Sequence, residues 1–180
     1  NGFHVFVADT NMAMIKNIEL NDAITPLLMD VTDRKSIERA FNEVKSQTDS
    51  LAGIVNFAGI LRVGSISEMP EEMLSQLLDI NVMGTYRVNQ IFLPLLNTDS
   101  KGRIINVSSE TGWQSGGPFN GAYAMSKHAI EAYSDSLRRE LMFLGISVIK
   151  LQPGPFKTNM VAGIETNFNQ AIEITQYFTK

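Results

Sequence analysis

The sequence has no cysteine among its 180 residues. Disulfide bonds, thiolate nucleophiles and cysteine-ligated metals are therefore excluded, and the composition is compatible with a reducing compartment. No apolar run approaches the length of a membrane-spanning helix, and the first residues have no signal-peptide pattern. From these features we expect a cytoplasmic protein, with a membrane anchor in a segment before residue 1 as the alternative.

Clusters of basic residues are also absent. The formal net charge is −4, and the longest basic run is the pair Arg138–Arg139, so we do not expect nucleic acid as a partner. Hydrophobic residues make up 44% of the chain and charged residues 19%, which is ordinary for a globular protein. The length fits one domain over residues 1–180. We expect no metal site.

Short apolar, β-branched runs alternate with longer amphipathic segments. This alternation predicts an α/β fold with a doubly wound parallel sheet and helices on both faces. The run 51–58 is almost continuously apolar, which is typical of a strand buried on both faces. The predicted strands cover residues 4–8, 25–29, 51–58, 102–107 and 146–151, and the predicted helices cover 33–46, a stretch from 67 or 69 to 96, and 120–144.

Polar residues gather where the predicted strands end. Ligands of open parallel sheets bind beyond the carboxyl ends of the strands, so we expect the functional site at this edge. The residues concerned are Asp9, Asp30, Asn56, Ser108, Ser109 and the segment 153–158.

Tyr123 and Lys127 lie one turn apart on the predicted helix 120–144. Their spacing places a phenol and an ammonium on one helix face. A nearby cation favours the phenolate, so we expect Lys127 to lower the pKa of Tyr123 by roughly one to three units, which would suit proton transfer. Alone, such a pair also occurs by chance as two solvated side chains.

Two further residues strengthen this interpretation. Ser109 follows a predicted strand and precedes Tyr123 by fourteen positions, and its hydroxyl is placed to hydrogen-bond a substrate carbonyl unless it merely ends the strand. Asn81 interrupts an apolar helical stretch, where an amide is unfavourable by propensity and costly if left unpaired. It is therefore either a satisfied core amide or a group that binds a functional water.

Five motifs together resemble the short-chain dehydrogenase/reductase family, in the same order and over essentially the whole chain. The segment Ser134–Leu141 resembles the branch that contains steroid and retinol dehydrogenases. The motifs are Asn56-Phe57-Ala58-Gly59, Asn81-Val82-Met83-Gly84, Ile105-Asn106-Val107-Ser108-Ser109, Tyr123-x-x-x-Lys127 and Pro153-Gly154-x-x-x-Thr158.

The resemblance implies a Rossmann-like fold and an oxidoreductase that transfers hydride between a nicotinamide cofactor and a secondary alcohol or ketone. It implies that Tyr123 is the general acid or base and that Ser109, with Ser108 as the alternative, orients the substrate oxygen. Lys127 would hold the nicotinamide ribose, and Asn81 would anchor a water. The competing hypothesis is a dinucleotide-sensing or scaffolding protein without turnover, which would have no use for an activated phenol.

The resemblance also implies a set of cofactor contacts. Asp30 and Val31 would approach the adenine, Asn56, Ala58 and Gly59 would lie along the adenosine side, and the segment 153–158 would border the nicotinamide. A carboxylate at Asp9 can accept hydrogen bonds from a ribose diol but repels a 2′-phosphate, so we expect NAD(H) over NADP(H). The full set is Asp9, Asp30, Val31, Asn56, Ala58, Gly59, Tyr123, Lys127, Pro153, Gly154 and Thr158.

The sequence departs from the family pattern at several points. It contains no Thr-Gly-x-x-x-Gly-x-Gly phosphate loop, and Phe57 stands where the family commonly has a second asparagine. The first and last strands of the family fold are also absent. We therefore expect strands 4–8 and 51–58 to lack the strand that would pair between them. We interpret the chain as part of a longer enzyme, and we expect that these 180 residues would not fold stably on their own.

The expected substrate is a small alcohol or ketone, including lipid-like ones. Five apolar side chains either line a substrate pocket or cap the core: Trp113, Phe119, Met160, Val161 and Phe168. Two long helices carry apolar residues beyond a single stripe, which favours a homodimer or homotetramer, as is common in the family. These residues are Met73, Leu77, Met83, Val88, Ala132 and Met142.

Overall fold

The structure is a computed structural model that describes residues 2–16, 22–96, 98–99, 102–156 and 163–178. All five predicted strands are present in it, and every strand pair is parallel. The α/β fold expected from the sequence is therefore confirmed. The strands are β1 (Val5–Asp9), β2 (Ile24–Leu28), β3 (Gly53–Asn56), β4 (Arg103–Val107) and β5 (Ser147–Leu151).

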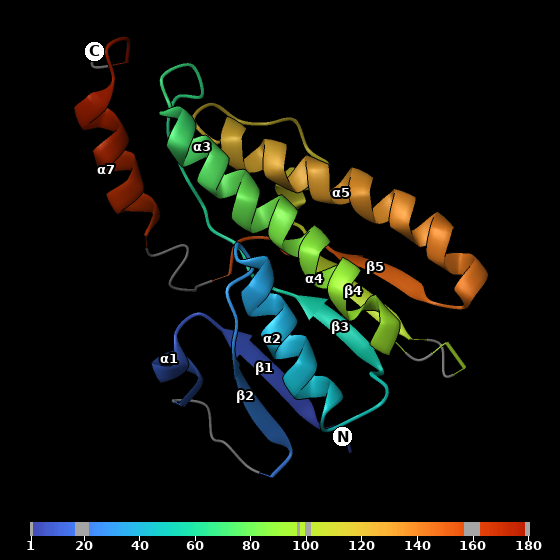
Figure 1. Cartoon of the computed structure of the whole chain (residues 1–180). Helices are drawn as coiled ribbons and strands as arrows, with labels where there is room; N and C mark the ends of the chain where they lie inside the picture. Colours follow the sequence, from blue (N-terminus) through green and yellow to red (C-terminus); the bar gives the residue numbers. More distant parts are fainter. Residues whose placement is uncertain (1, 17–21, 97, 100–101, 157–162, 179–180) are drawn as a thin grey trace.

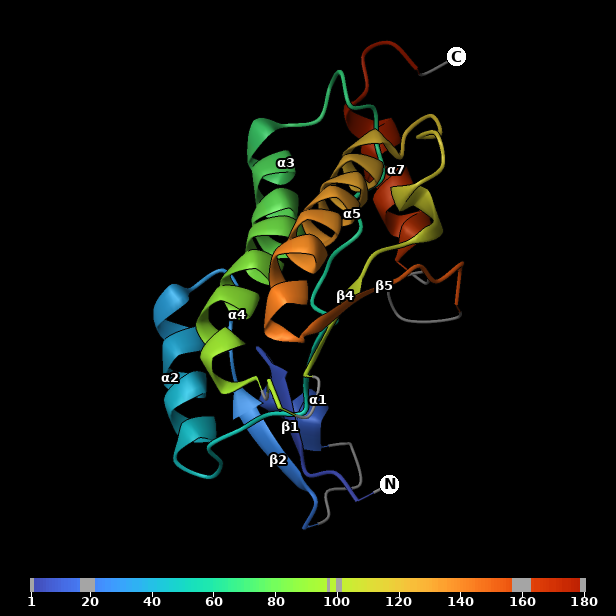
Figure 2. The same cartoon turned by 90° about the vertical axis from the view of Figure 1, so that its right-hand side faces the viewer.

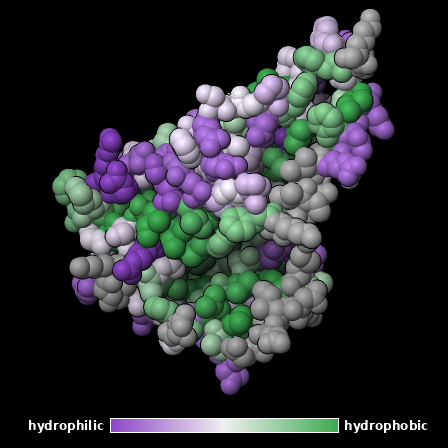
Figure 3. All heavy atoms as spheres, turned by 180° about the vertical axis from the view of Figure 1, so that it is seen from behind, coloured by the Kyte–Doolittle hydropathy of each residue, from purple (hydrophilic) through white to green (hydrophobic). Residues whose placement is uncertain are grey.

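The strands form two separate sheets, one of β1 and β2 and one of β3, β4 and β5. Among the described residues no strand pairing joins β1 to β3, as expected for a sheet that lacks the strand between them. Instead, a cavity of about 1730 Å³ lies between these two strands, with Val5, Val7, Gly53 and Val55 in its lining. Figure 1 shows the two sheets on either side of it, and Figure 3 shows a hollow with a largely hydrophobic rim.

Helix α2 (Arg34–Lys45) begins where the sequence predicts it. The carboxylate of Asp33 accepts a hydrogen bond of 2.9 Å from the backbone N–H of Lys35 and so caps the helix. Ile37, Ala40 and Val44 face inward and are buried. They join the core between the strands and the helices, where Ile54, Val88 and Ile104 are also buried.

The second predicted helix is not uniform. It begins at Glu71, later than predicted, because Pro70 occupies the cap position. It consists of helix α3 (Glu71–Leu78), the π-helix η1 (Asp79–Gly84), helix α4 (Thr85–Phe92) and the 3₁₀ turn η2 (Leu93–Leu95). π-helical segments inside α-helices often mark functional sites, and this one contains Asn81.

The third predicted helix is α5 (Gly121–Leu141), which ends in the 3₁₀ turn η4 (Met142–Leu144) before Gly145. Gly145 has a φ of 71°, the left-handed conformation that glycine adopts most easily at a helix end. Figure 2 shows α2, α4 and α5 on one side of the strands, with the short α1 (Met12–Lys16) on the other side. Helix α7 (Ile164–Ile174) lies near the start of α5.

Two expectations about burial are wrong. Strand β3 is buried on one face only, because Ile54 is 7% exposed whereas Val55 is 50% exposed. Leu77 and Val88 belong to the core of the chain itself, so they are not part of an exposed face for a second subunit. Within the described part of the chain, no helix combines the length and apolar character that a membrane crossing requires.

Candidate active site

Tyr123 stands in the first turn of α5, opposite the end of β4. Its hydroxyl shares a side-chain hydrogen bond with Ser109, which is the residue before the 3₁₀ turn η3 (Glu110–Gly112). The hydroxyl of Ser109 also accepts a bond of 3.3 Å from the N–H of Thr111. The side chain of Ser108 points toward Gly112 instead, where a Cβ would lie 2.5 Å from the Ser108 hydroxyl oxygen. Ser109 rather than Ser108 is therefore the serine beside the tyrosine.

Lys127 lies one turn after Tyr123 and is 6% exposed. Its Nζ donates a hydrogen bond of 2.9 Å to the carbonyl oxygen of Val107 and lies 5.5 Å from the centre of the Tyr123 ring. Burial lowers the pKa of Lys127 to about 8, because removing an ammonium from water disfavours its charged form.

Burial raises the pKa of Tyr123, and the hydrogen bond from Ser109 offsets this rise only in part. The expectation that Lys127 lowers this pKa is therefore wrong for this structure. The physical reason is that the phenol is itself partly removed from water, while the ammonium is directed to a backbone carbonyl and is desolvated as well.

Asn81 is 1% exposed within the π-helix η1. Its Oδ1 accepts a bond of 2.8 Å from the N–H of Ile60, and its Nδ2 donates to the carbonyl of Ile60 at 3.0 Å and to the hydroxyl of Ser126 at 3.1 Å. The amide is thus satisfied by the protein, as one of the two alternatives from the sequence requires. Its role in holding a water stays a prediction.

Gly59 connects this cluster to the cavity between the sheets. A Cβ at this position would lie 3.3 Å from Oδ1 of Asn81 and 3.8 Å from Nζ of Lys127, and Gly59 itself lines the cavity. A glycine here keeps the path between the cavity and the Asn81–Lys127 pair free of side-chain atoms.

The expected cofactor contacts fall into two groups. Pro153 and Gly154 lie beside η3: the N–H of Glu110 donates to the carbonyl of Pro153 at 3.1 Å, and a Cβ on Gly154 would lie 3.4 Å from Oε2 of Glu110. Thr158 lies outside the described residues. The other group lines the large cavity and consists of Asp9, Asp30, Val31, Asn56, Ala58 and Gly59.

The side chain of Asn56 belongs to a buried network that the sequence reasoning missed. Its Nδ2 donates to Oδ1 of Asn89 at 2.8 Å and to Oδ1 of Asn106 at 2.9 Å, and Nδ2 of Asn106 donates to the hydroxyl of Ser134 at 2.9 Å. These bonds join β3, β4, α4 and α5. The signal in the sequence was an asparagine inside each of two otherwise apolar strands, Asn56 and Asn106, whereas Asn89 lies between Arg87 and Gln90 and gave no such signal.

Two of the five apolar side chains proposed for a substrate pocket lie together. The rings of Phe119 and Phe168 are 6.2 Å apart, and both line a cavity of about 350 Å³ near helix α7. Trp113 is 65% exposed and does not belong to this lining. Met160 and Val161 lie outside the described residues.

Comparison with known proteins identifies the family of this chain. The family described as short chain dehydrogenase matches residues 1–169. The chain belongs to the short chain dehydrogenase family. The predicted likeness to the branch with retinol dehydrogenases is also confirmed, because retinol dehydrogenase 7 of Rattus norvegicus is 38% identical over 143 residues. That match covers 78% of this chain and 44% of the relative, so the chain spans less than half of that protein's length.

Two solved structures share the fold of this chain. A short-chain dehydrogenase from Streptomyces avermitilis superposes with a TM-score of 0.80 at 29% identity, over 88% of this chain and 60% of that chain. ElxO with bound NADP superposes with a TM-score of 0.80 at 26% identity, over 95% of this chain and 71% of that chain. The Rossmann-like fold expected for the short chain dehydrogenase family is therefore confirmed.

Proposed function

We propose that this chain carries the catalytic centre of an oxidoreductase that transfers hydride between a nicotinamide cofactor and a secondary alcohol or ketone. The observation that supports this most strongly is the convergence of Tyr123, Ser109, Lys127 and Asn81 at the carboxyl ends of β3 and β4. These four residues come from three segments, η1, the start of η3 and α5, so their meeting does not follow from the spacing of Tyr123 and Lys127 alone.

The residues at the rim of the large cavity, where β1, β2 and β3 end, suit a dinucleotide, whereas the deeper part between β1 and β3 is where the sheet lacks a strand. The cavity collects backbone from the ends of β1, β2 and β3, and Gly59 leaves open the side that faces Lys127. When bound, the nicotinamide would supply or accept the hydride. We assign Asp30, Val31 and the segment from Asn56 to Gly59 to the adenosine side, and we assign the Pro153–Gly154 segment to the end nearer the reacting carbon.

The protein's own residues would move the proton. The Tyr123 hydroxyl would donate its proton to the oxygen of a ketone, or accept one from an alcohol, with Ser109 holding the same oxygen by a hydrogen bond. A buried phenol with a raised pKa favours the protonated form that ketone reduction needs. Lys127 would hold the ribose, and Asn81 would anchor a water near it.

We infer a preference for NAD(H) over NADP(H) from Asp9. Its carboxylate ends β1 and lines the cavity, and Oδ1 already accepts a bond of 2.8 Å from the N–H of Asn11. A fixed negative charge at this place would repel a 2′-phosphate and accept hydrogen bonds from a free ribose diol.

We infer a substrate of modest size with apolar character. The retinol dehydrogenases among the relatives support this class, and so does the cavity lined by Phe119, Phe168 and Phe178. We also infer a homodimer or homotetramer. The half-exposed Met83 and Tyr86 on one helix and Met125 on another support it, since each exposes at least 40% of its surface.

The proposal can be tested by NADH absorbance in the full-length protein with a panel of ketones. Replacing Tyr123 by Phe should lower turnover by about 10²- to 10⁴-fold, because it removes the general acid. Tyr86→Phe is the matched control, since it removes a phenol hydroxyl from α4, away from the cluster. Equal turnover of wild type and Tyr123→Phe would refute the assignment, and dinucleotide binding without turnover of any ketone or alcohol would favour a sensing protein.

A further inference from the structure

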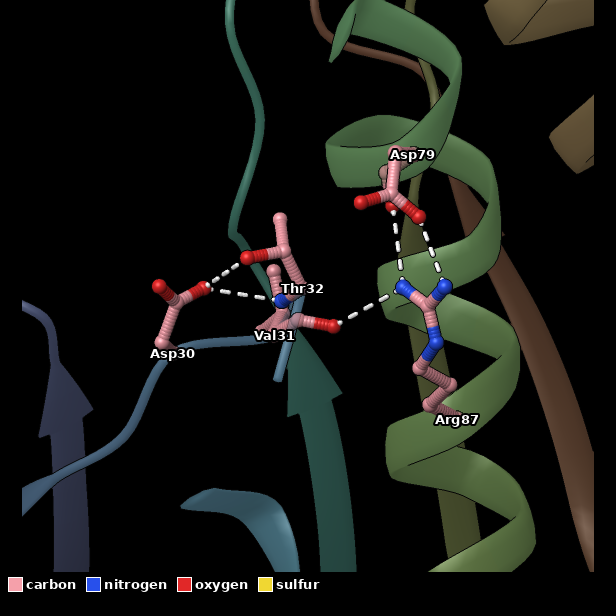
Figure 4. A network of polar contacts seen from close by, with 5 residues as sticks. All are labelled: Asp30, Val31, Thr32, Asp79 and Arg87. Carbon is pink, nitrogen blue, oxygen red and sulfur yellow. Dashed lines mark hydrogen bonds and ion pairs between the residues drawn. The ribbon is translucent and has the colours of Figure 1, made fainter. Parts of the chain in front are cut away.

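The turn after β2 is joined to the helix that holds Asn81 through one side chain, Arg87. From α4, Nη1 of Arg87 donates to the carbonyl oxygen of Val31 at 3.2 Å, and Nη2 donates to Oδ1 of Asp79 at 2.6 Å (Figure 4). Nη1 also lies 3.5 Å from the carbonyl oxygen of Asp79. The guanidinium therefore bridges the turn and the first residue of the π-helix.

A second contact lies at the same place. A Cβ on Gly84 would lie 2.7 Å from Cγ2 and 2.9 Å from Cβ of Val31, distances that no packed side chain could keep. Val31 therefore rests directly on the last residue of the π-helix. The polar contact through Arg87 and the steric contact through Gly84 hold the same residue of the turn.

The turn itself is ordered by Asp30. Its Oδ1 accepts hydrogen bonds from the N–H of Thr32 at 2.8 Å and from the Thr32 hydroxyl at 2.7 Å. The other carboxylate oxygen points away from this turn (Figure 4). Asp30, Val31, Thr32 and Asp79 all line the large cavity, so the bridge lies at its wall.

From this geometry we propose that Arg87 is a positioning residue for the adenosine half of the dinucleotide. It fixes the Asp30–Thr32 turn against the π-helix, and it thereby sets the distance between the adenosine end of the site and Asn81 at the catalytic end. This inference rests on the proposed function. Arginine suits the task because its planar group donates to two acceptors in fixed directions, which a lysine cannot do.

The bridge is partly shielded from solvent. The side chain of Arg87 is 20% exposed, and that of Asp79 is 39% exposed. Without the guanidinium the carbonyl of Val31 would lose its charged donor, and the steric contact between Val31 and Gly84 would remain between the turn and the π-helix. We therefore expect loss of the Arg87 guanidinium to weaken the binding of adenosine-containing molecules to the turn.

The test compares Arg87→Met with Arg34→Met in the full-length protein. Arg34 is the matched control because its guanidinium also bonds two partners, Glu38 at 2.9 Å and Gln90 at 2.8 Å, but neither partner belongs to the turn. In Arg87→Met the KM for NADH and the inhibition constant of ADP-ribose should rise together by about tenfold, as for one lost charged hydrogen bond, while kcat at saturating NADH stays unchanged. Arg34→Met should change neither constant.

Two further variants keep the test decisive if Arg87→Met folds poorly. Arg87→Lys retains the charge and should show a smaller rise in both constants, and Gly84→Ala should raise both by displacing Val31 with the arginine intact. A lower melting temperature with an unchanged ADP-ribose constant would show a merely structural role and overturn the proposal. A fall in kcat at constant KM would overturn it too. If the wild type neither binds ADP-ribose nor oxidises NADH with any ketone, the proposed function itself fails.

Discussion

The Nζ of Lys127 donates a 2.9 Å hydrogen bond to the carbonyl oxygen of Val107. The bond fixes the amine at the end of β4, where it is almost fully buried and where a Cβ on Gly59 would lie 3.8 Å from it. A lysine held in this way is paired with a dipole rather than with a carboxylate. Its protonation should therefore respond to pH in a range that can be measured.

The amine of Lys127 should titrate at about pH 8 in the folded protein, because burial lowers its pKa from the usual 10.5. Between these two values the unfolded chain binds more protons than the folded one, so stability should rise with pH across this window. At pH below this window, burying the charged amine should lower the free energy of unfolding by about 3 kcal/mol. NMR of the labelled amine and unfolding at several pH values provide the measurement.

Lys127→Met should lose that pH dependence, whereas Lys35→Met, which changes an exposed lysine on α2, should keep it. A titration of the Lys127 amine near 10.5 would show that the site is more hydrated than its burial indicates.

Replacing Ser108 and replacing Ser109 should have different effects on kcat and on stability. Ser109→Ala should lower kcat by about 10²-fold, because it removes a hydrogen-bond donor to the reacting oxygen and the partner of Tyr123. Ser108→Ala should act mainly on stability, since its hydroxyl packs against Gly112 and is buried. Steady-state kinetics and thermal unfolding of both variants distinguish the two roles, and a larger loss of kcat in Ser108→Ala would reverse the assignment.

Asp9 should control the choice between the two nicotinamide dinucleotides. In Asp9→Ala the ratio of kcat/KM for NADH to that for NADPH should fall, because the repulsion of a 2′-phosphate and the acceptor for the ribose diol are both removed. Asp49→Ala changes an exposed carboxylate outside the cavity lining and serves as the control. An unchanged ratio in Asp9→Ala would remove the basis for the NAD(H) preference.

The buried asparagine network should contribute strongly to stability. Asn106 is fully buried and serves three partners: Asn56, Asn89 and Ser134. Asn106→Ala should lower the free energy of unfolding by about 3 kcal/mol, because each buried polar group left unpaired costs roughly 1–3 kcal/mol. Asn42→Ala on the exposed side of α2 should change it little. Denaturant unfolding measures both, and a small effect of Asn106→Ala would mean that the neighbours pair with one another.

Local features of the sequence predicted the elements well. The strands follow from β-branched runs between turn residues, and the start of α2 follows from Asp33, whose carboxylate accepts a hydrogen bond from a backbone N–H of the first turn. The end of the helical stretch formed by α5 and η4 follows from Gly145, because a glycine easily adopts the left-handed conformation found there. The π-helix was not predicted, because an amphipathic pattern does not reveal where the helix takes up an extra residue around Asn81.

The sequence by itself determined the family, the five strands and the identity of the residues gathered at the strand ends, since these depend on short-range patterns and motif spacing. Only the tertiary structure decided how those residues behave. In the folded chain the side chain of Asn56 joins a buried hydrogen-bond network, Ser109 rather than Ser108 lies beside Tyr123, and Arg87 bonds the carbonyl of Val31. The direction of the pKa shift of Tyr123 was also decided there, because desolvation depends on distant segments that pack around the phenol.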